Sequence, residues 1–368
     1  MSTSAIAARL GAYAKIKTGK LDANASDPEG AYPFFTCSQE PLCISSFSYD
    51  CECVLVAGNG DLNVKYYNGK FDAYQRTYII ESADKQQLDV RYLFHFMSTY
   101  VEKLRQMSIG GVIKYIKLGN LTEARIPLPP LIEQKRISAI LDSTDALRDK
   151  RHATLAKLDI LTHAIFLDLF GDPVLNTKGW PLKKFGNIGM LDRGVSKHRP
   201  RNAPELLDGP YPLVQTSEIA NCDGYIRSHN SSYSDLGLRQ SKMWPAGTLC
   251  ITIAANIAKT GILTFDACFP DSVVGFRDED PAIVEFVRTW FSFLQQTIED
   301  SAPESAQKNI NLAILRNLDI PFPPLTLQRE FAHFINTIEN LKTTYRASLN
   351  EMDALFSSLQ HRAFLGEL

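Results

Sequence analysis

Several features that would place a chain in a broad class are missing from this 368-residue sequence. No apolar run approaches the roughly 20 residues that a membrane-spanning helix needs, and the run at 54–57 is typical of those present. The opening MSTSAIAARLGAYAK has no basic stretch followed by an apolar one, so it lacks the pattern of a secretory signal. We therefore expect a cytoplasmic protein without a membrane span.

Cysteine is scarce, and its spacing argues against two common uses. The seven cysteines are an odd number in a chain without a secretory pattern, which favours reduced thiols over a disulfide framework. Cys37, Cys43, Cys51 and Cys53 fall close together but lack the CxxC spacing with which two thiolates hold one zinc ion. We expect no metal site, and we expect Cys51 and Cys53 to pack on one face of a strand.

Catalytic signatures are absent as well. The segment GNGDLN at 58–63 lacks the third glycine of a dinucleotide loop, and no GxxxxGK[ST] loop is present. LPPL and FPPL are not the Asn/Asp-Pro-Pro-aromatic tetrapeptide of amino-methyltransferases, no lysine lies between Asp271 and Lys308 to complete a nuclease site, and no histidine pair has the HExxH arrangement. We expect a chain with no catalytic residue of its own.

Charge is nearly balanced, with 39 basic and 41 acidic residues and a net charge of -2. Such a chain has a poor global field for nucleic acid. Between Lys183 and Arg201, however, the sequence contains six basic residues and only one acidic residue, Asp192. This run is suited to phosphate contact, although a solvated loop would have the same composition.

An internal repeat is the strongest signal that the sequence does contain. Residues 126–170 align without a gap on 320–364, and twelve of the 45 positions are identical. Each copy opens with a proline cluster, IPLPPL or IPFPPL, and then becomes strongly helical. The offset of 194 residues between the copies defines equivalent positions, such as Gln134 and Gln328 or Asp159 and Asp353.

Both copies carry a narrow apolar stripe that advances by threes and fours, which predicts a helix of about 40 residues, roughly 60 Å long. A helix of that kind needs a partner, and the other copy is the simplest one, in an antiparallel coiled coil. The alternative is that each helix packs only on its own domain. The seam is predicted at Ile137, Leu141, Leu147, Leu155 and Leu158 in the first helix and at Phe331, Ile335, Leu341, Leu349 and Met352 in the second.

The segments before the two helices are also similar, because CVLVAGNG at 53–60 resembles TLCITIAAN at 248–256 as a strand that ends in small residues. The fold class is therefore α+β, with two α/β domains joined by two long helices. We expect the first domain at 1–130, the first long helix at 131–170, a linker and second domain at 171–324, and the second long helix at 325–368.

These residues resemble a known family, the specificity subunits of Type I restriction-modification systems. The resemblance covers essentially the whole chain and is carried by the two IPxPPLxxQ openings, the helix after each, the FGDPVLNTKGWPLKKFG bridge at 170–186 and the final AFLGEL. It implies a non-catalytic subunit with two target recognition domains, each of which reads half of a bipartite DNA sequence. The helices would fix the unread spacer and bind two methyltransferase subunits.

The resemblance also implies the cofactors and partners. S-adenosylmethionine would bind in the methyltransferase subunit and not in this chain, and adenine would be methylated there after base flipping. The partners would be double-stranded DNA, two methyltransferase subunits and the restriction and translocation subunits. The alternatives are a related restriction-modification assembly, or a helical scaffold that reads no DNA.

The family has no fixed base-reading motif to carry over, so candidate DNA contacts are chosen by residue type and loop position. In the first domain they are Lys15, Lys17, Lys20, Asn59, Asn63, Lys65, Tyr66 and Arg76. In the second domain they are Arg193, Lys197, Arg199, Arg201, Gln215, Asn256, Lys259, Gln307, Lys308 and Asn309.

Overall fold

The computed structural model describes residues 7–198, 200–254, 258–300 and 311–368, with only the backbone described for 296–300. It divides into two compact units, each with an α/β domain and half of each long helix. Unit 1 comprises Met1–Ala153 and Arg346–Leu368, and unit 2 comprises Thr154–Tyr345.

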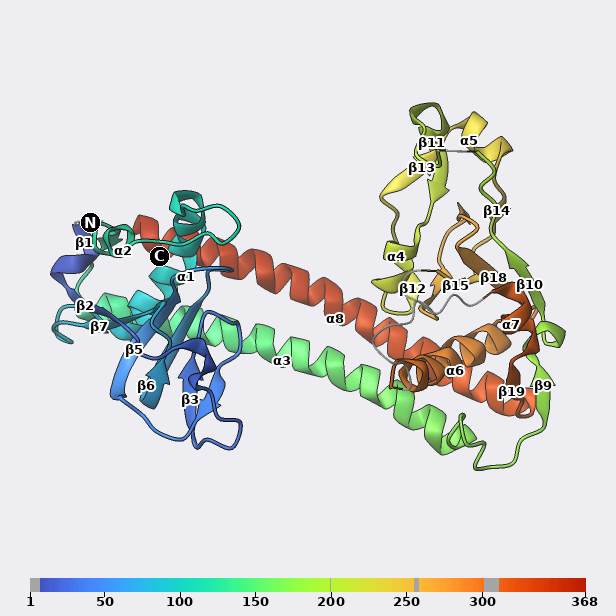
Figure 1. Cartoon of the computed structure of the whole chain (residues 1–368), viewed down its shortest axis with the longest axis horizontal. Coiled ribbons are helices and arrows are strands. Elements are labelled where there is room, and N and C mark those ends of the chain that lie inside the picture. Colours follow the sequence, from blue (N-terminus) through green and yellow to red (C-terminus); the bar gives the residue numbers. More distant parts are fainter. Residues whose placement is uncertain (1–6, 199, 255–257, 301–310) are drawn as a thin grey trace. The chain divides into compact units, whose positions relative to one another are not determined.

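Unit 1 contains a six-stranded sheet in the order β2-β7-β5-β6-β3-β4 (Figure 1). Its strands are β2 (Ala14–Thr18), β3 (Tyr32–Phe35), β4 (Leu42–Ile44), β5 (Tyr49–Ala57), β6 (Val64–Ala73) and β7 (Thr77–Ser82). Two further strands, β1 (Ala7–Arg9) and β8 (Arg125–Pro127), form a separate antiparallel pair. The helices of this domain are α1 (Val90–Met107) and the short α2 (Leu118–Thr122).

The central strand β5 is buried on both faces, which its apolar run CVLVA permits. Val54 and Val56 pack on the side of α1, whereas Cys53 and Leu55 pack on the opposite face among aromatic residues. Cys53 is fully buried and the partly buried Cys51 packs against the same cluster, which confirms the predicted role of both thiols. No group of ligands suited to a metal ion occurs among the described residues.

Unit 2 repeats this arrangement, because the order β10-β18-β15-β16 matches β2-β7-β5-β6. A fifth strand, β12, pairs parallel with β16. The strands of this sheet are β10 (Met190–Arg193), β12 (Tyr225–Ile226), β15 (Leu249–Thr252), β16 (Thr260–Leu263) and β18 (Val273–Arg277). The pair β9 (Leu182–Lys184) and β19 (Asp319–Pro321) is equivalent to β1 and β8.

A second, four-stranded sheet is added in unit 2, in the order β13-β11-β17-β14. Its strands are β11 (Leu207–Leu213), β13 (Ser231–Tyr233), β14 (Met243–Trp244) and β17 (Ala267–Cys268). The helices of this domain are α4 (Thr216–Ala220), α5 (Asp235–Arg239), α6 (Pro281–Asp300) and α7 (Leu312–Asn317). The domains therefore share a central topology but differ in the segments around it.

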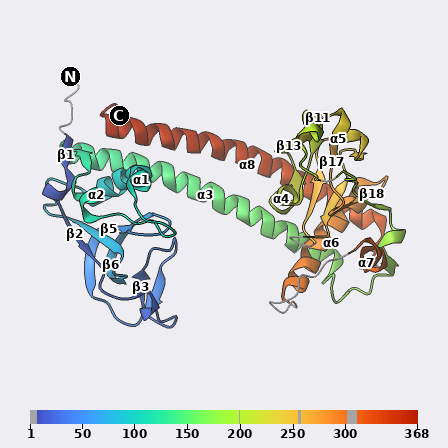
Figure 2. The same ribbon diagram turned by 45° about the horizontal axis from the view of Figure 1, so that its top comes forward.

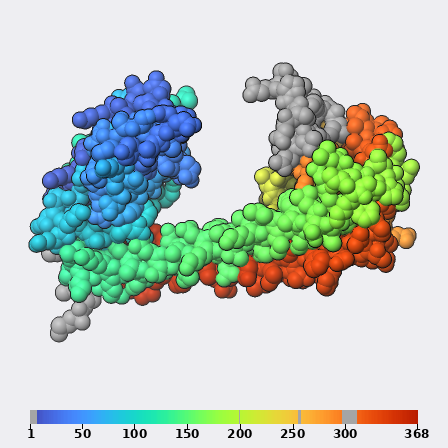
Figure 3. All heavy atoms as spheres, turned by 90° about the horizontal axis from the view of Figure 1, so that it is seen from below, coloured from blue at the N-terminus to red at the C-terminus, as the bar shows by residue number. Residues whose placement is uncertain are grey.

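The long helices are α3 (Leu131–Phe170) and α8 (Leu325–Leu365), and each begins directly after its proline cluster. In unit 1, Arg136 and Arg148 of α3 contact Leu368 and Asp353 respectively, so the two chain directions are opposed. In unit 2, Lys342 contacts Asp159 and Phe331 packs on Phe166 and Phe170, again with opposed directions. The predicted antiparallel pairing is confirmed in each unit, where Figure 3 shows the helices in contact.

The seam residues also serve the domains. Ile137 and Leu141 belong to a core cluster with α1, and Phe331 and Ile335 belong to one with α6, so neither pair packs only on the partner helix. In Figure 2, α1 lies close to α3. The two explanations for the apolar stripe therefore both hold in part. The other buried or half-buried seam positions are Leu155, Leu158, Leu349 and Met352.

Two seam assignments are wrong. Leu147 is 53% exposed and Leu341 is 42% exposed. Each lies six residues beyond a true seam residue, which turns it by about 120° around the helix at 3.6 residues per turn. The following residues, Arg148 and Lys342, lie seven residues on and take the inward place.

Candidate nucleic-acid interface

In unit 1, loops from three parts of the sequence meet at one end of the sheet. The loop after β5 and the β6–β7 turn are joined by a hydrogen bond of 2.8 Å from the amide of Gly58 to the carbonyl of Arg76. The loop after β2 joins the same end, since the amide of Gly19 donates to the carbonyl of Thr77 over 3.0 Å. A Cβ on Gly19 would lie 2.1 Å from the carbonyl oxygen of Ala73, so only glycine permits this approach.

Three predicted DNA contacts lie at this loop end: Lys20, Asn59 and Arg76. Lys20 and Arg76 are exposed, and Asn59 is half-buried. Lys15 and Lys17 are exposed on the edge strand β2, farther along the sheet, and Lys17 forms an ion pair of 2.5 Å with Glu81. The structure thus brings together three of the eight candidates in this domain and leaves two on a neighbouring edge.

Three other candidates are committed to contacts within the domain. The Asn63 amide is buried and donates to the carbonyls of Cys37 and Asp61 over 2.8 and 3.0 Å. Lys65 donates to the carbonyl of Ser38 over 2.7 Å, and burial lowers the pKa of Lys65. These two residues support the loop at 36–38 and are poorly placed to read bases.

Tyr66 belongs to a different site, which sequence reasoning missed. Its hydroxyl donates to Glu52 over 2.9 Å, and the Arg91 guanidinium lies 4.4 Å from the centre of its ring. Burial and this hydrogen bond raise the pKa of Tyr66 to about 12. A tyrosine held between a carboxylate and a guanidinium supports the domain and is poorly placed to contact DNA.

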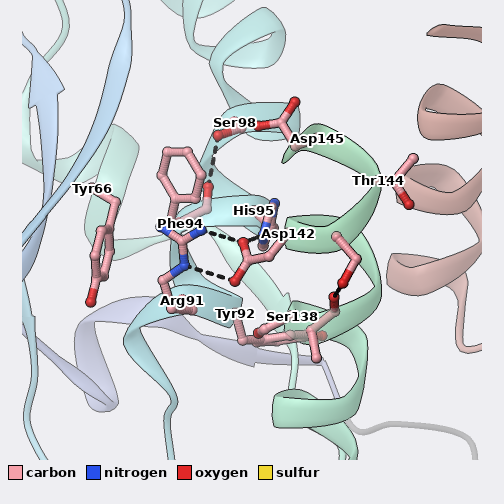
Figure 4. Close-up of polar contacts among 12 residues, drawn as sticks. Tyr66, Arg91, Tyr92, Phe94, His95, Ser98, Ser138, Asp142, Thr144 and Asp145 are labelled. Carbon is pink, nitrogen blue, oxygen red and sulfur yellow. Dashed lines mark hydrogen bonds and ion pairs between the residues drawn. The ribbon is translucent and has the colours of Figure 1, made fainter. Parts of the chain in front are cut away.

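The same arginine connects α1 to the long helix α3 (Figure 4). Arg91 forms a two-pronged ion pair with Asp142, and the buried His95 places Nε2 2.7 Å from the same carboxylate. Burial alone would raise the pKa of Asp142, but the hydrogen bonds from Arg91 and His95 outweigh it and hold that pKa below its ordinary value. Burial lowers the pKa of His95. A signal was present in the sequence, since residues 91 and 95 share one helix face.

Unit 2 gathers its basic candidates at the corresponding end of its sheet. Arg193 ends β10 and donates to the carbonyl of Asp271, while Arg201 forms an ion pair with the Asp271 carboxylate. The loop between them is fixed by Gln240, whose Oε1 accepts from the amide of Lys197 over 2.7 Å. All three basic residues are exposed, so the loop is held in place while its cations face solvent.

The remaining candidates of unit 2 divide into two groups. Gln215 is exposed at the start of α4 and lines one pocket together with Arg201 and Tyr233. Lys259 is half-buried and directly precedes β16 in the sequence. The candidates that lie outside the described residues are Arg199, Asn256, Gln307, Lys308 and Asn309.

Unit 2 also connects its domain to a long helix through charged groups. Arg227 forms an ion pair of 2.8 Å with Glu339 of α8, and Lys342 bonds both Glu339 and Asp159. Nearby, the hydroxyl of Tyr225 donates to Glu285 of α6 over 2.6 Å. Each domain thus has its own set of ion pairs to the helices, with different residues.

Comparison with known proteins assigns the chain to a protein family. The family model described as Type I restriction modification DNA specificity domain matches residues 8–158 and again residues 178–351. The chain belongs to this family. The two matches fall on the two α/β domains together with parts of the long helices, so the family domain occurs twice, as the internal repeat predicts.

The curated relatives agree with this assignment. The specificity subunit of the Type I restriction enzyme EcoDI from Escherichia coli is 28% identical over 402 residues, which cover 98% of this chain and 87% of that protein. The EcoBI specificity subunit from Escherichia coli is 23% identical, with 86% of this chain and 74% of that protein covered. The specificity-subunit resemblance inferred from the two proline-helix repeats is thereby confirmed.

Solved structures support the fold. The S subunit of a Type I restriction-modification system from M. genitalium matches with a TM-score of 0.64 at 16% identity, covering 97% of this chain and 95% of that chain. A chain from a structure on complex assembly and conformational transition of the type I system matches with a TM-score of 0.56 at 16% identity, covering 100% and 99%. None of the helices in the described residues combines the length and the hydropathy that a membrane span requires.

Proposed function

We propose that this chain is the DNA-reading subunit of a Type I restriction-modification complex and that each domain reads one half of a bipartite target. The observation that carries the proposal is the duplicated sheet end. In both domains the same strand order presents loops with exposed cations, Lys20 and Arg76 in one and Arg193, Lys197 and Arg201 in the other. Different side chains on equivalent loops are what two different half-sites require.

The long helices would set the gap between the two half-sites. An α-helix rises 1.5 Å per residue, so the 40 residues of α3 extend about 60 Å, and each added turn would lengthen this spacer by about 5.4 Å. A rigid spacer converts protein length into a number of base pairs, as the half-site spacing of dimeric DNA-binding proteins does. The ion pairs that connect each domain to the helices would hold that domain at a fixed orientation on the spacer.

Chemistry would belong to the partner subunits. Methyltransferase subunits would bind S-adenosylmethionine and transfer its methyl group to adenine, and restriction subunits would join the same complex. This chain would contribute no catalytic residue. Its net charge of -2 is a weak field for DNA, so we expect the isolated chain to bind DNA weakly and to need its partners for affinity.

Two equivalent docking surfaces on the helices would account for two methyltransferase subunits. Leu147 and Leu341 hold equivalent positions in the repeat, as do Leu161 and Leu355, and all four side chains are exposed. Unit 1 has Leu147 and Leu355, and unit 2 has Leu341 and Leu161. Apolar side chains that recur at matched exposed positions favour one partner that binds twice.

The test is to co-express the chain with its candidate methyltransferase subunit and to map adenine methylation across the host DNA by long-read sequencing. We expect a two-part motif with a fixed gap, which disappears when this chain is omitted. A stable complex that methylates no motif would favour the alternative of a helical scaffold that reads no DNA. Methylation of a continuous motif would contradict the bipartite reading.

A further inference from the structure

A hollow at the loop end of unit 1 combines one free amide with exposed apolar side chains. Asn59, Tyr74 and Ile113 line it together, although they come from three separate loops. Within the described part of the chain, the Asn59 side chain has no hydrogen-bond partner, whereas the neighbouring Asn63 is fully engaged. The amide of Asn59 is therefore available to a ligand.

The loop that brings Ile113 to this hollow, residues 109–115, is fixed at its base. Ile109 and Tyr115 exchange two backbone hydrogen bonds of 3.0 and 2.8 Å, and the amide of Gly60 donates to the carbonyl of Lys114 over 2.9 Å. The backbone of Tyr115 also forms an isolated antiparallel β-bridge with that of Asn59. The tip of the loop consequently has a defined position beside the amide.

Much of the loop 109–115, from base to tip, is apolar and faces solvent. Val112 is fully exposed, Ile113 is 63% exposed, and Ile109 and Tyr115 are also exposed. Single exposed apolar residues are ordinary, but four within seven residues on an anchored loop indicate a contact surface. Lys114 and Lys117, both exposed, flank the tip with positive charge.

We infer that this hollow recognises an A·T base pair from the major groove, with Asn59 bonded to the adenine edge and Ile113 packed on the thymine methyl group. The inference rests on the proposed function. Asparagine can bond both N6 and N7 of adenine, and apolar side chains contact the methyl group that only thymine carries there. The adjacent placement of an amide and an isoleucine matches the two halves of that pair.

The experiment uses the complex assembled from the full chain and its methyltransferase subunit. Synthetic duplexes carry the mapped target, with deoxyuridine in place of each thymine in turn, which removes one methyl group and nothing else. At one position we expect methylation to slow about fourfold, the loss that corresponds to one buried methyl-sized group. In the Ile113→Ser variant the same substitution should have no effect, because the two changes remove one shared contact.

A second arm tests the amide with the adenine that pairs with that thymine. Replacing it by 7-deazaadenine, which lacks N7, should slow the wild-type complex but not the Asn59→Ala variant. The matched control is Leu236→Ser, since Leu236 is 47% exposed in the other domain, and this variant should keep both wild-type ratios.

The outcomes are separable. A wild-type complex that shows no motif on unmodified DNA would overturn the proposed function and this inference with it. A complex that reads its motif would overturn the inference alone in two cases: no deoxyuridine position slows the wild type, or Ile113→Ser retains the full penalty at each position that does.

Discussion

Asp159 and Asp353 hold equivalent positions in the two helix repeats, and each accepts an ion pair from the equivalent basic residue of the opposite helix. Lys342 Nζ lies 2.5 Å from Asp159 Oδ1, and Arg148 Nε lies 2.6 Å from Asp353 Oδ1. Because residue 148 is the repeat equivalent of residue 342, the same pairing occurs once in each unit. The antiparallel helix pair therefore carries an internal two-fold correspondence in its contacts as well as in its sequence.

The two ion pairs differ in burial, and so should their energies. The Lys342 side chain is 6% exposed and also bonds Glu339, whereas Arg148 is 24% exposed. We expect Lys342→Ala to lower the free energy of unfolding by about 2 kcal/mol, because a buried cation loses its charged hydrogen bonds to Asp159 and Glu339, of which Glu339 keeps an ion pair with Arg227. Arg148→Ala should cost about 1 kcal/mol, since its partners remain partly solvated.

Hydrogen exchange of α3 and α8 measures the loss of stability for each variant in the unit that carries it, unit 1 for Arg148→Ala and unit 2 for Lys342→Ala. The exposed Lys157→Ala is the control on the same helix pair. All three tryptophans lie in unit 2, so urea titration by tryptophan fluorescence gives a second measurement for Lys342→Ala. Equal losses for the two variants would contradict the ranking.

His95 predicts a pH dependence of stability in unit 1. Burial holds the pKa of His95 below its ordinary value of 6.5, so the unfolded chain binds more protons than the folded chain as the pH falls below that value. Stability should therefore decrease on acidification through this window. Asp142 affects stability at lower pH than His95 does. Its pKa is depressed in the folded chain, so its contribution to stability is present above pH 3.8 and is lost only as the pH falls through the folded value.

Hydrogen exchange of peptides from α1, compared at pH 7.5 and pH 5.5 after correction for intrinsic rates, measures this effect. His95→Gln should reduce the difference between the two pH values, while His152→Gln, on an exposed position of α3, should leave it unchanged. An undiminished difference in His95→Gln would assign the pH dependence to other groups.

Gln134 and Gln328 hold equivalent positions in the repeat, but their side chains form different numbers of hydrogen bonds. Gln134 donates to the carbonyls of Gln87 and Pro129 and accepts from the amide of Asp89, each within 2.9 Å. Gln328 donates to the carbonyl of Pro323 over 2.8 Å, and its buried Oε1 has no partner among the described residues. Gln134→Leu should cost about 1–3 kcal/mol by orphaning buried backbone groups, and Gln328→Leu should cost less. Exchange rates at the starts of α3 and α8 compare them directly, and a larger loss at residue 328 would refute the argument.

The exposed leucines predict the stoichiometry of the complex. Leu147→Lys with Leu355→Lys should remove one methyltransferase subunit, and Leu341→Lys with Leu161→Lys should remove the other, because each pair lies in one unit. The four side chains are exposed, so the free energy of unfolding of each variant should stay within about 0.5 kcal/mol of the wild-type value. Native mass spectrometry of the co-expressed complex counts the subunits. Two bound copies in either double variant would exclude these leucines from the docking surface.

The sequence alone determined the architecture at the level of repeats. The 194-residue offset, the two proline clusters and the long apolar stripes predict two equivalent helices and two equivalent domains, because these signals are local and recur. The helix face was predicted less well. Counting apolar residues placed Leu147 and Leu341 in the seam, whereas helical geometry gives that place to Arg148 and Lys342, whose long chains can reach a carboxylate while they pack.

Only the tertiary structure decided which polar residues share a site. Lys20, Asn59 and Arg76 meet because β2, β5 and β7 are neighbours in the sheet, a pairing between distant segments that no local pattern encodes. The same pairing commits Asn63 and Lys65 to carbonyls of a neighbouring loop. A loop residue's type indicates what it can bond, but the backbone groups that the fold places within reach determine whether it remains free for DNA.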